Sequence, residues 1–299
     1  MAQQLRAIKR RIGSVKSTQK ITRAMELIAS SRIIKAQQRV SAARPYAEEM
    51  RRLMGMVAKK SVSIDHPLFN QRSEIRRIGT VVITADRGLA GAYNSNVIRR
   101  AERDLQAHGK ESMLFLAGKK AVNYFKFRGY EIEHSWTGMS DRPHIDDARE
   151  VARAAAEAFT SGEVDEVRLV YTRFDSALTQ RPVTIQLLPL PKEEFTSEDE
   201  VITKGPKPSY VFEPEPEEIF DGLLPRYLEN TVLQGMLEAS ASEHAARRRA
   251  MKAATDNAEE LIDNLTRVYN QARQAEITTE IMEVVGGAEA LTGAAKQEA

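Results

Sequence analysis

Apolar residues near the N-terminus recur at alternating spacings of three and four positions, the pattern of a helix that packs along one stripe against a second helix. The stripe takes in twelve positions, nine of them apolar: Leu5, Ile8, Ile12, Val15, Gln19, Thr22, Glu26, Ala29, Ile33, Ala36, Val40 and Ala43. Pro45 interrupts the pattern, which then resumes as far as residue 60. The pattern therefore predicts a coiled-coil helix over residues 1–60.

The three polar members of this stripe are consecutive, and at their level the helix has a second apolar face. Ile21, Met25 and Ile28 each lie one residue before a stripe position, which is about 100° away around an α-helix. We expect these three side chains to face away from the partner helix and toward another protein surface, with Met25 the most exposed. Irregular supercoiling is the alternative explanation.

A second stripe of the same kind predicts a coiled-coil helix over residues 217–287. Its positions are Ala254, Ala258, Leu261, Leu265, Val268, Ala272, Ala275, Thr279 and Met282. Upstream, the same stripe would pass through Ser240, His244 and Arg247, so we expect regular packing to fail there. Because neither long helix can be stable alone with its apolar stripe exposed, we expect the two helices to pair.

Prolines and glycines mark the predicted limits of the second helix. Pro225 should kink the helix or start a new one, and Gly286-Gly287 should end it. Residues 288–299 are then expected to form a disordered tail. Residues 191–216 hold five prolines and several acids, a composition typical of an exposed connector.

Between the two helices, residues 75–190 alternate between strand and helix patterns. Buried strands are predicted at residues 78–86, 112–118, 130–136, 166–174 and 181–190, with helical patterns after each of the first three. This alternation predicts a Rossmann-like, mostly parallel sheet flanked by helices, and the last two strands suggest an antiparallel hairpin at one edge. The predicted fold class is α/β plus a long coiled coil.

Charge is distributed unevenly over these parts. Residues 1–60 carry 15 Lys and Arg against 3 Asp and Glu, whereas residues 217–299 carry 8 against 15. A basic and an acidic helix are electrostatically suited to lie side by side. A basic coiled-coil protein that binds nucleic acid or serves as a scaffold remains an alternative, although this basic segment contains a single aromatic residue, Tyr46.

Candidate catalytic chemistry is sparse. The chain has no Cys, and its five His show no i, i+4 pair, so we expect no metal site and no cofactor. The stretch TADRGLAGAYNSN (84–96) joins a strand to a helix through a glycine turn, as phosphate-binding loops do, but it matches neither familiar nucleotide motif. A tight structural turn is the simpler interpretation, with Asp86 and Arg87 as an ion pair or helix cap. An α/β nucleotide-binding enzyme with a coiled-coil arm is the alternative.

Five motifs together resemble the gamma subunits of F-type ATP synthases. They are STQKITRAMELIAS, ARPYAEEM, DRGLAGAYN, ASEHAARRRAMKAATDNAEELI and VYNQARQAEITTEIMEVVGGAEAL. The resemblance implies an antiparallel coiled coil that forms the central shaft of a rotary motor, with the α/β domain at its foot. It also implies that the chain is not itself an enzyme, because the catalytic nucleotide sites of this family lie on the beta subunits.

The resemblance also implies partners and contact residues. Three alpha and three beta subunits would surround the shaft, and the epsilon subunit and the c-ring would contact the foot. The implied partner-contact residues are Ile21, Met25, Ile28, Arg247, Arg273, Gln274, Thr278, Glu280 and, near the c-ring, Tyr210. With no transit peptide evident, we expect a bacterial protein, peripheral on the cytoplasmic side of the cell membrane.

Overall fold

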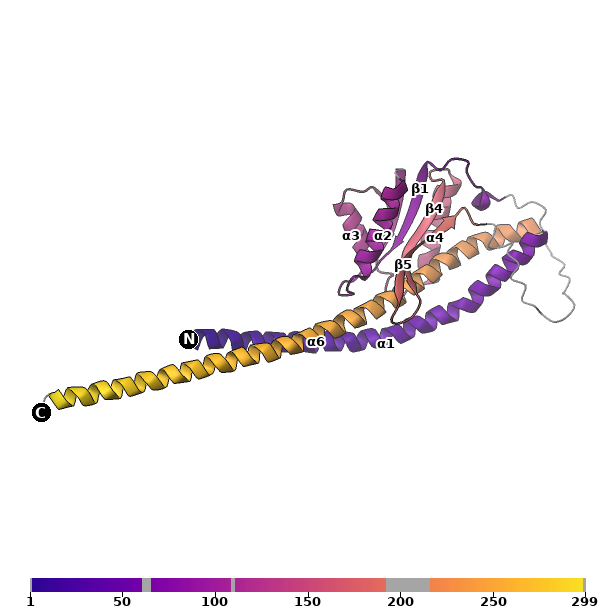
Figure 1. Cartoon of the computed structure of the whole chain (residues 1–299). Helices are drawn as coiled ribbons and strands as arrows, with labels where there is room; N and C mark the ends of the chain where they lie inside the picture. Colours follow the sequence, from indigo (N-terminus) through magenta and orange to yellow (C-terminus); the bar gives the residue numbers. More distant parts are fainter. Residues whose placement is uncertain (1, 61–65, 109–110, 192–215, 298–299) are drawn as a thin grey trace. The chain divides into compact units, whose positions relative to one another are not determined.

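A computed structural model of the chain describes residues 2–60, 66–108, 111–191 and 216–297. The chain divides into two compact units, Met1–Ile28 with Arg249–Ala299, and Ala29–Arg248. Two long helices, α1 (Ala2–Lys60) and α6 (Pro216–Gln297), contribute residues to both units (Figure 1). The predicted connector and Tyr210 lie outside the described residues.

The larger unit contains a five-stranded sheet. Its strands are β1 (Arg77–Ile83), β2 (Glu111–Ala117), β3 (Ile132–Trp136), β4 (Glu166–Phe174) and β5 (Gln180–Leu188). The order is β3-β2-β1-β4-β5. Neighbouring strands are parallel except that β5 runs antiparallel to β4. The predicted mostly parallel sheet with an antiparallel hairpin at one edge is therefore confirmed.

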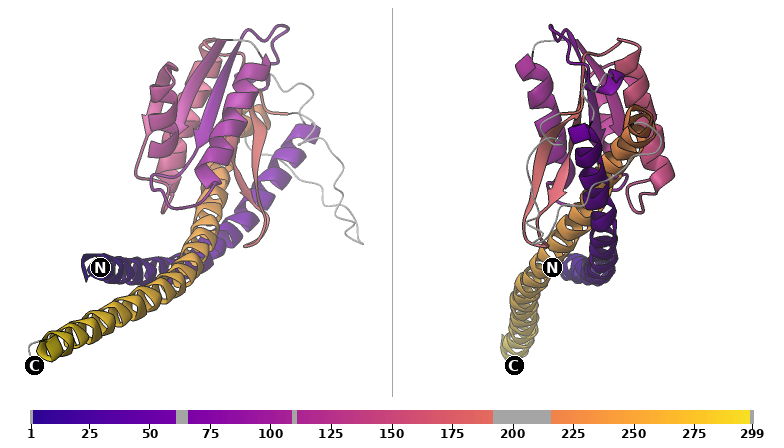
Figure 2. Two further views of the ribbon diagram at one scale, coloured as in Figure 1. Left: turned by 60° about the vertical axis from the view of Figure 1, so that its left-hand side comes forward. Right: turned by 90° about the vertical axis from the view of Figure 1, so that its right-hand side faces the viewer.

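Strand alternation divides the core of this unit between the two faces of the sheet. Val82 packs with residues of α2 (Tyr93–His108) and α3 (Lys119–Phe127), whereas Val81 and Ile83 pack with α4 (Ile145–Thr160) and the first part of α6. Successive side chains of a strand point to opposite faces, so each face needs its own helical cover. Figure 2 shows this layered arrangement from two further directions.

Helix α6 continues through Pro225, where the sequence predicted a kink or a new helix, and through Gly286-Gly287, where it predicted the end of the helix. Pro225 lies within the helix, and its neighbours Leu224 and Tyr227 are buried in the core, so tertiary packing holds the helix on both sides of the proline. Gly286-Gly287 also lies inside α6, which is helical to Gln297. Each glycine costs a helix only about 1 kcal/mol relative to alanine, which weakens the helix without ending it. Residues 288–297 are thus helical, and the rest of the predicted tail lies outside the described residues.

In the smaller unit, a hydrogen bond joins the two helices. The hydroxyl oxygens of Thr22 on α1 and Thr255 on α6 lie 2.8 Å apart, and both residues are buried. In the larger unit, Ala36 and Val40 of α1 form a cluster with Leu237 and Ala241 of α6. Within each unit the two helices therefore pair along the predicted α1 stripe, with Thr22 at one of its three polar positions.

The predicted stripe on α6 is correct at five of its nine positions, which are buried or partly buried. Ala258 is buried and Leu265 is partly buried, as expected, but Leu261 and Val268 are 38% and 49% exposed. Ile262 and Tyr269 are the partly buried residues instead. The sequence has apolar side chains both at 261 and 268 and at 262 and 269. A stripe that leaves Ala258 can therefore step by three residues to Leu261 or by four to Ile262, and the sequence does not distinguish the two. The contacts of the folded helix settle that order.

Candidate partner-contact surfaces and a buried polar network

An exposed apolar face lies on α1 in the smaller unit. Ile21 is 58% and Ile28 is 54% exposed, as predicted, although both are large aliphatic residues. Met25 is only partly buried rather than the most exposed of the three, so that expectation is wrong. Its neighbour Glu26 is partly buried as well, so the covered side of the helix is broad enough at this level to reach Met25.

A second exposed surface lies on the C-terminal third of α6. Arg273, Gln274, Thr278 and Glu280 are all exposed there, as a partner-contact surface requires. The Thr278 hydroxyl donates to the Gln274 carbonyl oxygen 2.9 Å away, within the helix itself.

Large apolar side chains share this end of α6: Ile277, Ile281, Met282, Val284 and Val285 are all exposed. The pairing of Thr22 with Thr255 explains why. The two helices rise equally per residue, so Leu5, 17 residues before Thr22, lies at the level of Ala272, 17 residues after Thr255. Helix α1, described from Ala2, therefore has no described residue at the level of α6 positions beyond about 275. Exposed apolar patches of this kind mark protein interaction surfaces.

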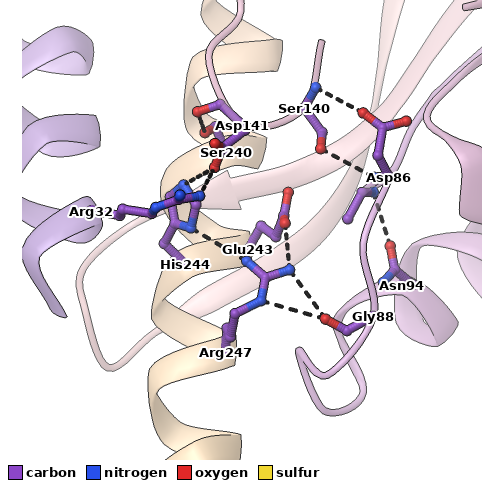
Figure 3. A network of polar contacts seen from close by, with 11 residues as sticks. Arg32, Asp86, Gly88, Asn94, Ser140, Asp141, Ser240, Glu243, His244 and Arg247 are labelled. Carbon is purple, nitrogen blue, oxygen red and sulfur yellow. Dashed lines mark hydrogen bonds and ion pairs between the residues drawn. The ribbon is translucent and has the colours of Figure 1, made fainter. Parts of the chain in front are cut away.

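Arg247 lies in the larger unit and is only 8% exposed. Its Nη2 atom donates to Glu243 Oε1 at 2.6 Å and to the carbonyl oxygen of Gly88 at 3.2 Å (Figure 3). Burial raises the pKa of Glu243, and the Arg247 guanidinium partly offsets that rise. In this structure the arginine therefore ties α6 to the loop after β1, and it does not present its charge to solvent.

His244, one turn before Arg247, is 2% exposed and stands between two charged groups. Its Nδ1 atom lies 3.4 Å from Arg247 Nη1, and its Nε2 atom lies 3.3 Å from Asp141 Oδ1. A guanidinium can only donate, so Nδ1 must accept and the single ring proton belongs on Nε2, facing the carboxylate. Burial lowers the pKa of His244 to about 4, and Arg247 and Arg32 add to that effect against the opposing influence of Asp141. The ring is neutral at physiological pH.

The loop that contains the glycine turn has a structural role. The Asp86 carboxylate accepts backbone N–H bonds from Lys119, Gly138 and Ser140 at 3.1, 2.9 and 3.2 Å. Lys119 is the first residue of α3, so Asp86 acts as a helix cap, one of the two structural roles expected for it. These backbone donors are of the kind that a phosphate would need, and a carboxylate of the chain already holds them.

The structure therefore offers no support for a nucleotide site at this loop. Within the described ranges, no group of three or more His, Cys, Asp or Glu side chains is placed to hold a metal ion. Across the same ranges, none of the helices combines the length and the apolar character that crossing a bilayer requires.

Sequence reasoning missed Asp141 and Arg32 altogether. It identified Ser240, His244 and Arg247 as polar residues on an apolar stripe, but it could not name their partners. The irregular stripe was the available signal, because buried polar groups need hydrogen-bond partners and those partners must come from elsewhere in the fold.

Comparison with known proteins identifies the family. The family model described as ATP synthase matches residues 4–291. The chain is 51% identical to the ATP synthase gamma chain of Parafrankia sp. over 302 aligned residues, covering 99% of this chain and all of that one. The gamma chain of Mycolicibacterium smegmatis is 48% identical, with coverage of 98% and 99%.

Solved structures agree on the fold. A chain from the OSCP/F1/c-ring structure of Euglena gracilis mitochondrial ATP synthase aligns with a TM-score of 0.64 at 17% identity, covering 97% of this chain and 95% of that one. A chain from the central stalk and c-ring of Tetrahymena thermophila mitochondrial ATP synthase aligns with a TM-score of 0.58 at 23% identity, covering 78% and 99%. At 51% identity over the whole length of a curated relative, the chain belongs to the family of ATP synthase gamma chains.

Proposed function

We propose that this protein is the central rotor shaft of a proton-translocating F-type ATP synthase, where it couples rotation of the c-ring to the conformational cycle of the catalytic beta subunits. The observation that carries the proposal is 51% identity to a gamma chain over 99% of this sequence. The protein is a non-catalytic subunit, and the Asp86 loop fits that role because its carboxylate serves the fold.

Three alpha and three beta subunits surround the shaft in this proposal, and the epsilon subunit and c-ring contact the foot. Two exposed surfaces support an enclosing partner. One is the apolar face with Ile21 and Ile28, and the other is the end of α6 with its exposed Ile, Met and Val side chains. A monomeric soluble protein has little reason to leave both uncovered.

Individual contact residues follow from this assignment. Ile21, Met25 and Ile28 meet the ring of alpha and beta subunits from α1. Four exposed polar residues meet it from α6: Arg273, Gln274, Thr278 and Glu280.

Arg247 and Tyr210 complete the proposed contact residues. Arg247 is proposed to meet a beta-subunit carboxylate, which requires its guanidinium, now buried beside Glu243 and Gly88, to become accessible to that partner. Tyr210, outside the described residues, is proposed near the c-ring by resemblance.

The chain is a peripheral subunit of a membrane-bound complex. We propose that it lies on the cytoplasmic side of a bacterial cell membrane. The identity of about one half to gamma chains from Parafrankia and Mycolicibacterium supports the bacterial origin.

A substitution at Met25 tests the shaft assignment. Met25→Lys introduces a cation that can extend from a partly buried position toward carboxylates on the surrounding ring. A new ion pair would favour some rotary angles over others, so proton-driven ATP synthesis per assembled complex should fall while assembly persists. Met25→Leu keeps the apolar contact and should retain nearly full synthesis.

The measurement is ATP synthesis in vesicles that contain the complete complex, normalised to the amount of alpha and beta subunits that co-purify. Equal synthesis by the two variants would show that Met25 does not face the ring. Failure of the wild-type chain to co-purify with alpha and beta subunits would overturn the proposed function itself.

A further inference from the structure

The loop between β3 and α4, residues 137–144, is fixed to the end of strand β1. Asp86 Oδ2 accepts N–H bonds from Gly138 and Ser140, and the Asp86 N–H donates to Ser140 Oγ at 3.0 Å. Three hydrogen bonds to one residue leave this part of the loop little freedom to move independently of the sheet. The next residue along, Asp141, therefore has a position set by the α/β domain.

Asp141 in turn contacts both long helices within the same unit (Figure 3). Its Oδ1 atom pairs with Arg32 Nη1 of α1 and lies 3.3 Å from His244 Nε2 of α6. Its carbonyl oxygen accepts a hydrogen bond from the Ser240 hydroxyl of α6 at 3.4 Å. One loop residue thus links the sheet to α1 and to two successive turns of α6.

The charges of this group suit a directional contact. His244 is neutral and donates its one N–H, so Arg32 supplies the positive charge that faces the Asp141 carboxylate. Charge-assisted hydrogen bonds are shorter and stronger than neutral ones. The carboxylate is 37% exposed, which limits the contribution of the pair to stability without removing its geometric preference.

The apolar contacts of α1 at this level cannot set its rotation to the same degree. The buried α1 side chains nearest Arg32 are Ala29, Ile33, Ala36 and Val40, two of them alanines. Apolar burial is non-directional and depends on area. A helix that packs through small apolar side chains can turn by a small angle about its axis with little change in buried area, whereas the same turn moves the Arg32 guanidinium away from the fixed carboxylate.

We propose that Asp141 is a positioning residue for torque transmission. It adds directional contacts to the apolar packing of α1 and α6 on the α/β domain, so that both helices resist rotation relative to the domain when torque enters through the foot. This inference rests on the proposed function as a rotor shaft. It assigns a mechanical role to Asp141, Arg32, His244 and Ser240, none of which faces a catalytic nucleotide in that proposal.

The test uses the complete ATP synthase with variants at Asp141 and at its exposed neighbour Arg142. A bead on the α/β domain reports the angular fluctuation of the rotor while the surrounding ring holds the shaft in a catalytic pause. Asp141→Ala removes the carboxylate contacts with Arg32 of α1 and His244 of α6 and keeps the bond from Ser240 to the backbone carbonyl oxygen. We expect the angular variance to rise about twofold, since both side-chain contacts of the carboxylate are lost together. Asp141→Asn keeps an acceptor oxygen without the charge, so its variance should lie between those of Asp141→Ala and wild type.

Arg142→Ala is the matched control and should fluctuate as wild type does. Proton-driven ATP synthesis, which loads the rotor, should fall more in Asp141→Ala than unloaded ATP hydrolysis does. A purely structural role would lower the melting temperature or the yield of complex and leave the variance of assembled rotors unchanged.

Each result has a defined meaning. Equal variance in Asp141→Ala, Arg142→Ala and wild type overturns the inference while the shaft assignment stands. If Asp141→Ala does not assemble, the Asp141→Asn variant decides, and wild-type variance there counts against the inference. A wild-type complex that does not rotate would refute the proposed function instead.

Discussion

Acidification should destabilise the fold through His244. The ring is buried between Arg247 Nη1 and the Asp141 carboxylate, with Arg32 and Glu243 close by. Protonation would place an N–H on Nδ1, directly against a guanidinium that can only donate. Burial is the main cause that weakens proton binding in the folded state, and the two guanidinium groups of Arg247 and Arg32 add to it, so the pKa falls from the ordinary 6.5 to about 4.

The sign of the effect follows from proton linkage. Between pH 6.5 and 4 the unfolded chain binds more protons at this residue, so the free energy of unfolding increases with pH across that window. The stabilisation is complete above pH 6.5 and is lost as the pH falls toward 4. At about 1.4 kcal/mol per pKa unit, the loss is about 2 kcal/mol at pH 5 and about 3 kcal/mol at pH 4.

The assay is urea unfolding of the full chain at a series of pH values between 8 and 4.5, for wild type and His244→Gln. Glutamine can accept from Arg247 and donate to Asp141 without titrating. Other shifted groups, including His66, Glu238 and Glu243, contribute to both curves and largely cancel in the difference. The wild-type curve should fall below its own pH 8 value by about 2 kcal/mol more than the variant curve does at pH 5.

Parallel curves would refute the reasoning. They would mean that the folded and unfolded chains bind a proton at His244 equally well. The Nε2-protonated ring between Asp141 and Arg247 would then be the wrong description of the site.

Two further substitutions test the fold, each against a matched control. Gly118→Ala should lower the free energy of unfolding by about 3 kcal/mol or more, because the φ angle is +105° and a Cβ would clash with the Thr84 carbonyl oxygen. Its control is Gly129→Ala, at φ +76° with open space around it, which should cost about 1 kcal/mol. Urea unfolding measures both. Leu265→Asp should lower the free energy of unfolding by about 1–2 kcal/mol more than Leu261→Asp does, because Leu265 is partly buried and Leu261 is 38% exposed. Equal melting temperatures for the two variants would contradict the observed buried face of α6.

Much of the architecture could be predicted from the sequence because it depends on local periodicity. Alternating strands and helices in residues 75–190 predicted a parallel sheet, and the absence of a helix between the last two strands predicted their antiparallel pairing. The stripes on the terminal helices predicted that these helices pair. The family motifs are likewise a property of the sequence, so the resemblance to gamma chains does not depend on the structure.

Local pattern could not determine the rotation of each helix or the partners of its polar groups. Apolar residues at both 261 and 262 permit two phases of the same stripe, and the helix packing selects 262. Met25 was expected to be the most exposed residue of its face, yet the covered side of α1 extends to it. Packing against the core also carries α6 through Pro225, although proline is the strongest local signal for a break.

The polar network depended entirely on tertiary structure. Arg32 and Asp141 are 109 positions apart in the chain, and Gly88 and Arg247 are 159 apart. The sequence by itself determined that Ser240, His244 and Arg247 interrupt an apolar stripe, and hence that something polar must lie opposite them. Only the tertiary structure decides which polar groups lie opposite them. A buried charge is stabilised by the particular atoms around it, and those atoms come together only when the sheet, its loops and both long helices are in place.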